Sequence, residues 1–441
     1  MIKYLLISII IVVFFLTWIF ASLKKYTVRF FPLLLLEISS VSQLSFNNIP
    51  IYIFSSIIFI GSYLILSILS LKKYRNNYIK DKKIRWGYPV IIEILYFTYL
   101  FFYLFSTLFG EYTFHYLNSS LYCLLMIIVS IFILDFLKRD KEAILFLLYG
   151  LFLFGIIISI LIYIIYFTTI NAPLVRSITE YRIFENTFGA AGHYGICIMG
   201  IISGLTLLSF ELEIFEKYKN VTRKFNKKKL LIFFGVIFIF FAIVLTGGRF
   251  SLVISFFLLI PYFWYFLKRN SRKFRIKIIF IIFFVFFGCL FLFQNNNNII
   301  REYSERFSNL SSNNYMEIFF GKTRAEVNKL ILKSSNINLL GKGRGTTSAI
   351  AGKYFNIGTH NFYLEILFDA GIFALFLYVL IILLILFLGY KKKGYFSVNI
   401  FGIGIFLLVY SFYGGFGSHI FLTFLISLSI GIYGLSFKNQ N

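Results

Sequence analysis

Long apolar runs recur along the whole chain, and they constrain its fold more than any other feature. They occur at residues 3–22, 30–46, 50–71, 89–109, 119–137, 143–168, 190–210, 230–246, 250–267, 276–294, 362–388, 397–412 and 419–436. Each run is close to the roughly 20 residues that a helix needs to cross the hydrocarbon core of a membrane. Because 59% of the residues are hydrophobic, a soluble domain could not bury this much apolar surface. We therefore predict an all-α polytopic membrane protein with about 12–13 transmembrane helices.

Basic residues are distributed unequally between the loops that connect these runs. The formal net charge is +25, which in a soluble protein would suggest nucleic acid. When successive loops are assigned to alternate sides of the membrane, about 30 of the 43 Lys and Arg residues fall on one side. That side is cytoplasmic by the positive-inside rule, which predicts an outer N-terminus and a cytoplasmic C-terminus. We expect no nucleic-acid partner, and a first run that is retained because it lacks a small-residue cleavage site.

One segment between the apolar runs is much longer than the others. Residues 295–361 form the only sizeable extramembrane segment of the sequence, and the alternation of sides places them outside. We expect residues 1–294 to hold transmembrane helices 1–10, and residues 362–441 to hold helices 11–13. The outer segments 169–189 and 246–249 are expected to contribute to a site together with this large loop.

The large loop contains a pattern typical of a short amphipathic helix. Thr323-Arg-Ala-Glu326 matches a capping box, in which the first and fourth residues satisfy backbone groups at a helix start. Apolar and basic residues then alternate at helical spacing: Val327, Lys329, Leu330, Ile331 and Lys333. Such a helix can lie on the membrane surface or pack on the ends of other helices. The sequence leaves both interpretations open.

Several arginines lie on the predicted outer side, against the general bias. They are Arg176, Arg182, Arg249, Arg301, Arg306, Arg324 and Arg344. Arg249 lies in Thr246-Gly-Gly-Arg249, a very tight connection between two apolar runs, where an arginine is usually retained for a partner. Guanidinium groups bind phosphate oxygens bidentately, so the cluster suggests a phosphate or pyrophosphate ligand at the membrane surface. The alternative for any one arginine is that it reaches toward lipid headgroups.

Most other polar chemistry gathers around the start of the run Phe362–Leu388, which we expect to be one long helix. Gly341-Lys-Gly-Arg-Gly345 precedes it in the sequence, His360 and Asn361 lie directly before it, and Glu365 and Asp369 lie within its first turns. We expect this stretch to form an active site at the outer face of the membrane.

Each of these polar residues has a functional and a structural interpretation. Histidine titrates near neutral pH as a residue type. His360 can therefore take a proton from an acceptor hydroxyl, or it can make a structural hydrogen bond. Glu365 and Asp369 are four residues apart, so they share a helix face, where they can orient His360 or pair with arginines. His193 is a second candidate histidine.

No metal or cofactor is expected. The histidines are isolated, the three cysteines lie inside apolar runs, and no acidic pair has ligand spacing in the outer loops. The Gly-Lys-Gly-Arg-Gly stretch follows no strand pattern, so it is not a nucleotide-binding loop. An outward-facing enzyme of this kind would need an activated donor already in the membrane, such as a polyprenyl pyrophosphate.

The motifs resemble those of the O-antigen ligase/polymerase superfamily over roughly residues 180–390. Gly341-x-Gly-x-Gly345 with His360-Asn-x-Tyr-Leu-Glu365 and Gly371 is similar to the signature of that superfamily. Thr246-Gly-Gly-Arg-Phe-Ser251 resembles its Ser-Arg-Gly segment.

Two further segments resemble the superfamily with departures. The stretch from Arg182 through Gly189 to Gly195 resembles an Arg-x-x-Gly-x-Phe-x-x-Pro-Asn segment, with Gly192-His193 in place of Pro-Asn. Arg324 resembles the arginine of a Gly-Arg-x-x-x-Trp piece, but the aromatic residue is missing.

The resemblance implies a metal-independent membrane glycosyltransferase of the C-type fold, located in the bacterial inner membrane with a periplasmic active site. It implies a donor linked to undecaprenyl pyrophosphate, held by Arg182, Arg249, Arg324 and Arg344. His360 would engage the acceptor hydroxyl with Glu365 beside it, and Asn361, His193 and Asp369 would contact substrate. The implied partners are lipid-linked oligosaccharides, membrane lipids, a chain-length regulator and a flippase.

Three functions remain open from the sequence. A polymerase transfers the growing glycan onto the next lipid-linked repeat unit, and the Phe-, Ile-, Lys- and Asn-rich composition is commoner among such proteins. A ligase, which shares the motifs, transfers the glycan to lipid A-core or to a protein. A transporter of lipid-linked sugars would place ionisable groups near the midplane of the membrane, where Glu37 is the one candidate.

Overall fold

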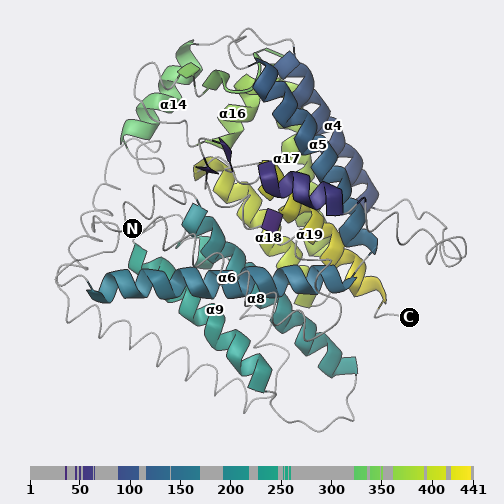
Figure 1. Ribbon diagram of the computed structural model, residues 1–441, viewed down its shortest axis with the longest axis vertical. Helices are drawn as coiled ribbons and strands as arrows, with labels where there is room; N and C mark the ends of the chain where they lie inside the picture. Colours follow the sequence, from purple (N-terminus) through teal and green to yellow (C-terminus); the bar gives the residue numbers. More distant parts are fainter. Residues whose placement is uncertain are drawn as a thin grey trace, which may run out of the picture.

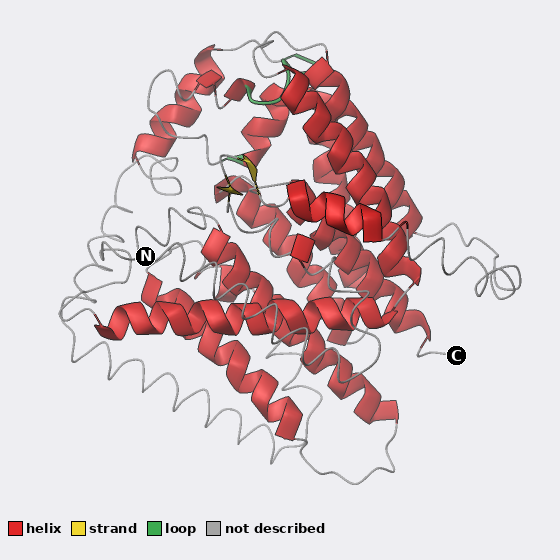
Figure 2. Ribbon diagram, viewed as in Figure 1, coloured by secondary structure: helices red, strands yellow, loops and turns green. Residues whose placement is uncertain are grey.

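The computed structural model describes about half of the chain, and this part is almost entirely helical (Figures 1 and 2). The described residues are 35–36, 45–46, 49–50, 53–62, 64, 88–108, 116–139, 141–168, 192–217, 227–246, 252, 254–256, 258–259, 322–334, 338–347, 349–350, 361–391, 395–413 and 419–438. The labelled helices are α4 (Tyr88–Leu108), α5 (Tyr116–Arg139), α6 (Lys141–Thr168), α8 (Gly192–Lys217), α9 (Lys227–Thr246), α14 (Lys322–Ser334), α16 (Phe362–Asp369), α17 (Gly371–Lys391), α18 (Tyr395–Tyr413) and α19 (His419–Lys438).

The predicted fold class, an all-α membrane protein, is confirmed. Within the described part, the segments Tyr88–Leu108, Ile144–Phe167 and Gly371–Lys391 are long and apolar enough to cross a membrane. Backbone groups in hydrocarbon must be satisfied within the segment, and a helix does this for an apolar sequence. The large apolar side chains on the outside of these helices, such as Phe101 and Phe376, are more than half exposed, as a lipid-facing surface requires.

Most apolar runs in the described part form helices close to their predicted bounds. Runs 89–109, 119–137 and 143–168 correspond to α4, α5 and α6, and the last two runs correspond to α18 and α19. The run at 30–46 departs from this pattern, because Ser45–Phe46 (β1) pairs in antiparallel fashion with Ile49–Pro50 (β2). The runs at 3–22 and 276–294 lie outside the described residues.

The expected single helix from Phe362 to Leu388 is wrong. It is divided into α16 and α17 at Ala370 and Gly371, where Gly371 has a φ of +90°. Residues with a side chain rarely adopt a positive φ. An α-helix requires a negative φ at every residue, so a continuous helix cannot pass through Gly371. The apolar pattern continues across the break because the residues on both sides are buried, which is why periodicity alone did not reveal it.

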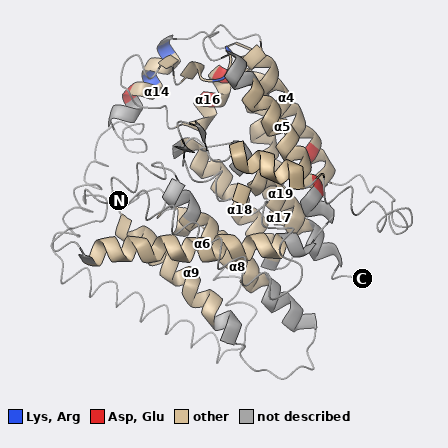
Figure 3. Ribbon diagram, viewed as in Figure 1, with Lys and Arg blue, Asp and Glu red and all other residues tan. Residues whose placement is uncertain are grey.

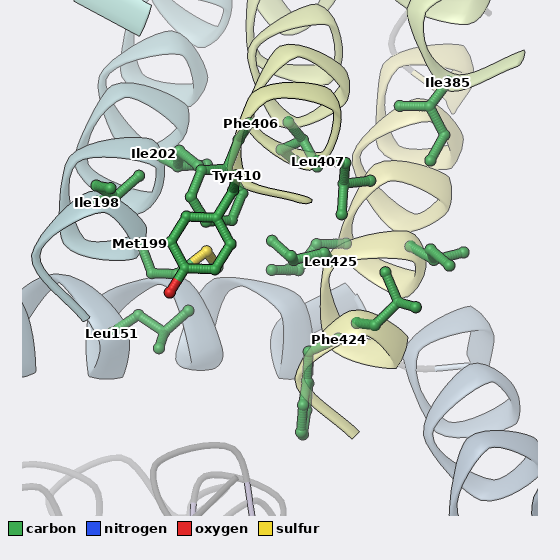
Figure 4. Packing of buried hydrophobic residues seen from close by; sticks show 14 of the residues in the cluster. Leu151, Ile198, Met199, Ile202, Ile385, Phe406, Leu407, Tyr410, Phe424 and Leu425 are labelled. Atoms are coloured by element: carbon green, nitrogen blue, oxygen red, sulfur yellow. The ribbon is translucent and has the colours of Figure 1, made fainter. Parts of the chain in front are cut away.

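The helices form two groups that meet along α18. In one group, α6 packs against α8 and α9. In the other, α17 packs against α4 and α18, and α5 packs against α4 and α19. Figure 4 shows the junction, where Met199 and Ile202 of α8 face Phe406 and Tyr410 of α18, all of them buried.

Several polar side chains inside the second group are paired between helices. Thr423 of α19 lies 2.6 Å from the Tyr96 hydroxyl of α4 and 2.9 Å from the Ser130 hydroxyl of α5. The Tyr378 hydroxyl of α17 lies 2.6 Å from that of Ser411 in α18. Such bonds join apolar helices, because an unpaired hydroxyl in hydrocarbon is costly.

One end of the α4–α17 pair brings together two residues that border loops which the sequence assigns to the same side. Lys391, at the end of α17, donates a hydrogen bond to the Tyr88 hydroxyl at the start of α4 with a length of 3.3 Å. Both residues border loops that the sequence assigns to the cytoplasm. The opposite ends, Leu108 of α4 and Gly371 of α17, therefore lie on the other side. That this other side is periplasmic stays a prediction.

The amphipathic helix of the large loop packs on protein. α14 buries Val327 and Ile331 in a small cluster with Phe368 of α16 and Ile350. Of the two interpretations that the sequence left open, packing against other parts of the chain is the one observed. The helix begins at Lys322, one residue before the proposed capping threonine. Its residues Glu326, Lys329 and Lys333 are exposed, and Figure 3 shows basic and acidic residues along α14.

Candidate active site

A turn rich in glycine lies against the junction of α16 and α17. We call residues 341–347 the glycine turn. Its three glycines, Gly341, Gly343 and Gly345, have φ values of +74°, +98° and +89°. Glycine is the residue that adopts positive φ without steric cost, so the repeated spacing is required by the backbone path itself.

Backbone hydrogen bonds fasten the glycine turn to the end of α16. The Lys342 N–H donates to the Phe368 carbonyl at 2.8 Å, and the Gly343 N–H donates to the Asp369 carbonyl at 3.0 Å. The last carbonyls of a helix lack partners within the helix, and the turn supplies them here. On the other side of the break, the Ile372 N–H donates to the Asn338 carbonyl at 3.3 Å.

The two chain segments approach so closely that glycine is needed on both. A Cβ atom on Gly341 would lie 2.5 Å from the Asp369 carbonyl oxygen. A Cβ atom on Gly371 would overlap the Leu339 carbonyl oxygen. The glycine turn and the helix break are therefore one structural unit, formed by residues about 30 positions apart in the chain.

The side chain of Asp369 binds the far end of the glycine turn. Its Oδ2 accepts a hydrogen bond from the Gly345 N–H at 2.7 Å, and its Oδ1 accepts from the Thr347 N–H at 3.1 Å and the Thr347 hydroxyl at 2.9 Å. The Tyr103 hydroxyl of α4 donates to Oδ2 over 3.4 Å. The residue is 4% exposed. A buried carboxylate is tolerated when donors surround it in this way.

Burial and hydrogen bonding act on the Asp369 carboxyl in opposite directions. Asp369 precedes the membrane-spanning segment that begins at Gly371. Burial has the largest effect and raises the pKa of Asp369 above its ordinary value. The bonds from Gly345 and Thr347 and the charge of Arg344 lower the pKa again by stabilising the ionised form.

Arg344 lies at the centre of the glycine turn and contacts α4 near its C-terminal end and α5 near its N-terminal end. Its Cζ atom is 3.3 Å from the centroid of the Tyr122 ring of α5. Its backbone N–H donates to the Thr107 hydroxyl of α4 over 3.4 Å. A guanidinium stacked on an aromatic ring gains cation–π stabilisation and keeps its N–H groups in one plane.

Asn361 and Glu365 lie at the start of α16. The Asn361 side chain accepts a hydrogen bond from the Leu364 N–H at 3.2 Å, so it is the N-cap of the helix, and it is 6% exposed. An N-cap asparagine stabilises a helix by about 1 kcal/mol relative to alanine. Glu365 lies in the first turn, where a carboxylate is favoured by the helix dipole.

The side chains of the remaining predicted site residues lie outside the described part of the structure. Arg182, Arg249 and His360 lie outside the described residues. His193 lies in the first turn of α8, and Arg324 lies near the start of α14, but in both cases only the backbone is described. The predicted site residues with described side chains are Arg344 on the glycine turn, Glu365 and Asp369 in α16, and Asn361 at the N-cap of α16.

Four residues that sequence reasoning missed complete this arrangement. They are Tyr103 and Thr107 of α4, Tyr122 of α5, and Thr347. The three on α4 and α5 lie more than 200 positions before the turn, and tyrosine is too common in this chain, with 31 copies, for these to be recognised. Thr347 follows the glycine turn directly, where a hydroxyl often binds a nearby carboxylate or backbone group.

Within the parts of the chain that are described, no group of three His, Cys, Asp or Glu side chains could hold a metal ion. Among the residues that the structure describes, the charged groups of the glycine turn and α16 are the Arg344 guanidinium, the Lys342 ammonium and the carboxylates of Glu365 and Asp369. The glycine turn thus carries two cationic side chains at one end of the helices, and the buried Asp369 carboxylate holds the turn in place.

The fold and site together define a helical membrane protein that holds a basic glycine turn at one end of its bundle. A family model described as O-antigen ligase matches residues 234–379, a segment that contains α14, the glycine turn and α16 and ends inside α17. The resemblance to the O-antigen ligase/polymerase superfamily is thereby confirmed, and the match supports a membrane glycosyltransferase of ligase or polymerase type. No curated protein matches the chain.

Proposed function

We propose that this protein polymerises a lipid-linked polysaccharide at the periplasmic face of the bacterial inner membrane. It transfers a glycan from undecaprenyl pyrophosphate onto the next lipid-linked repeat unit. The observation that supports this proposal most is Arg344, held on a rigid turn at one end of the helices within the segment that matches the O-antigen ligase family. A fixed cation at the membrane surface suits the pyrophosphate of such a donor.

In the proposed reaction, the acceptor hydroxyl oxygen forms a bond to the anomeric carbon of the donor sugar. The bond between that carbon and the pyrophosphate oxygen breaks, and undecaprenyl pyrophosphate leaves with the electron pair. His360 takes the proton of the acceptor hydroxyl, with Glu365 orienting the imidazole.

Charge develops on the pyrophosphate as it leaves, and cationic groups stabilise it. Arg344, Arg249, Arg182 and Arg324 are the proposed donors. A preorganised donor of this type is typically worth about 2.7–4 kcal/mol of transition-state stabilisation. The stack on Tyr122 supports this role for Arg344, since a guanidinium already fixed in one plane loses less freedom when it binds phosphate oxygens.

Deletion of the gene in its host tests the proposal. Lipopolysaccharide or surface polysaccharide is separated on a gel from the deletion strain and from strains that carry the wild-type gene or Arg344→Ala. A polymerase predicts that a single repeat unit is still transferred to its acceptor while the ladder of longer chains disappears. Accumulation of long lipid-linked polymer with no transfer to the acceptor would instead identify a ligase.

The ligase is the second candidate function, because the matching family model is itself described as O-antigen ligase. A ligase uses the same donor and the same proposed roles for Arg344 and His360, and it differs only in the acceptor. Transport of lipid-linked sugars is the third. Single-cysteine variants at Arg249 and His360 separate transport from transfer, because labelling that switches sides with substrate is expected of a transporter alone.

A further inference from the structure

Asp369 is placed to act on Arg344 through the backbone of the glycine turn. Its two carboxylate oxygens accept hydrogen bonds from the N–H groups of Gly345, which follows Arg344 directly, and of Thr347, two positions further along the chain. The Thr347 hydroxyl adds a third bond to the same carboxylate. The direction in which the Arg344 side chain leaves the turn therefore depends on these contacts.

The carboxylate also occupies donors that a phosphate could otherwise use. Successive backbone N–H groups in a glycine-rich turn form a concave site for anions. Here the anion is the carboxylate of Asp369, which is 4% exposed and lies inside the protein. A phosphate ligand that approaches the glycine turn must then be bound by side chains, of which Arg344 and Lys342 are the cationic ones on the turn.

We propose that Asp369 is a positioning residue that holds the glycine turn so that Arg344 faces the pyrophosphate of the donor, and that it does not contact the substrate itself. This inference rests on the proposed function, because it assigns pyrophosphate as the ligand of Arg344. It replaces the substrate contact that the sequence suggested for Asp369.

Two other sets of contacts keep the fold intact when Asp369 is altered conservatively. The Lys342 and Gly343 N–H groups donate to main-chain carbonyls, which any residue at position 369 retains. The Arg344 backbone also bonds to Thr107. Asp369→Asn keeps the side-chain volume but replaces one acceptor oxygen by an NH₂ group. Whichever oxygen is replaced, the NH₂ group then faces an N–H donor, that of Gly345 or that of Thr347. The expected result is a local displacement near Gly345 to Thr347 in a folded protein.

The first experiment measures the turn without any substrate. Full-length protein in lipid nanodiscs is compared by hydrogen–deuterium exchange for wild type, Asp369→Asn and Thr347→Val. The peptide that covers residues 341–350 should exchange about 10-fold faster or more in Asp369→Asn, because bonds to a charged acceptor are lost. Thr347→Val, which removes one of the three bonds, should have a smaller effect in the same direction. Glu326→Gln, on the exposed side of α14, is the matched control and should match wild type.

The second experiment measures coupling to Arg344. Binding of undecaprenyl pyrophosphate is measured for Asp369→Asn, Arg344→Ala and the double variant. If Asp369 acts through Arg344, each single variant weakens binding about 10-fold and the double variant is no weaker than Arg344→Ala. Independent, multiplicative losses in the double variant would overturn the inference, as would unchanged exchange in the first experiment.

The two experiments separate failure of this inference from failure of the proposed function. Weaker binding in Arg344→Ala together with wild-type binding in Asp369→Asn overturns the inference and leaves the proposed function standing. Unchanged binding in Arg344→Ala overturns the use of Arg344 for pyrophosphate, and with it the role proposed for Asp369, whatever the exchange result.

Discussion

Substitution of Gly371 by alanine tests whether the glycine turn and the helix break form one rigid unit. Gly371 has a φ of +90°, and the positive-φ conformation costs an L-residue about 1–2 kcal/mol. The new Cβ would also overlap the Leu339 carbonyl oxygen, so the two segments must separate. Loss of the hydrogen bonds from Ile372 to Asn338 and from Lys342 to Phe368 would add about 1 kcal/mol each. We expect a total loss of stability of about 3–4 kcal/mol.

Two other glycines provide matched controls for this substitution. Gly345 has a φ of +89° but open space where a Cβ would lie, so Gly345→Ala should cost only the backbone term of about 1–2 kcal/mol. Gly61 lies in a helix, also with open space, and Gly61→Ala should leave stability unchanged or raise it by up to about 1 kcal/mol. The assay is the unfolding of purified protein in detergent micelles. Equal losses in Gly371→Ala and Gly345→Ala would refute the close approach.

Three further substitutions follow from the described contacts. Arg344→Lys should lower the rate of glycan transfer about 10-fold, because lysine lacks the planar fork that stacks on Tyr122 and binds phosphate bidentately; an unchanged rate would argue against both contacts. Asn328→Leu should raise stability by about 1–3 kcal/mol, because both amide atoms of this fully buried side chain lack hydrogen-bond partners among the described residues; a loss of stability with loss of activity would contradict this expectation. Thr423→Val should cost about 0.5–1.5 kcal/mol, since it removes the hydroxyl that lies within hydrogen-bond distance of both Tyr96 and Ser130; unfolding in detergent measures the loss.

The transmembrane helices could be predicted well because lipid imposes a simple requirement. A run of apolar residues in hydrocarbon has to satisfy its backbone internally, so a run such as 143–168 indicates a helix, and α6 spans Lys141–Thr168. The run at 30–46 contained Glu37 and several polar residues, and its end forms β1 instead. The rule fails where a polar sequence dilutes the pattern.

The helix break at Gly371 could not be derived from hydropathy. Hydropathy describes which residues are buried, whereas the break is a property of the backbone conformation at one glycine. The glycine spacing and Gly371 were noted because they resemble a family signature, and the positive φ values give the physical reason for that signature. Their contact with each other required the three-dimensional structure.

In the candidate site, sequence spacing predicted the local structure but not the long-range contacts. The spacing of Glu365 and Asp369 correctly indicated a shared helix, because both lie in α16. The partners of Asp369 include Gly345 and Thr347, 24 and 22 positions away, and Tyr103, 266 positions away. Sequence spacing carries no information about such contacts. The side chain of Asn361 caps α16, and the substrate contact suggested for this residue stays a prediction. Local signals predict caps and helices, and long-range packing decides which side chains meet.

The most direct test of the proposed function is reconstitution with a defined donor. Purified full-length protein in nanodiscs is given an undecaprenyl-pyrophosphate-linked repeat unit isolated from the host, with no lipid A-core acceptor present. The account predicts a ladder of lipid-linked polymer with the wild-type protein and none with Arg344→Ala. Absence of polymer until lipid A-core is added, followed by transfer of the glycan to that acceptor, would contradict it.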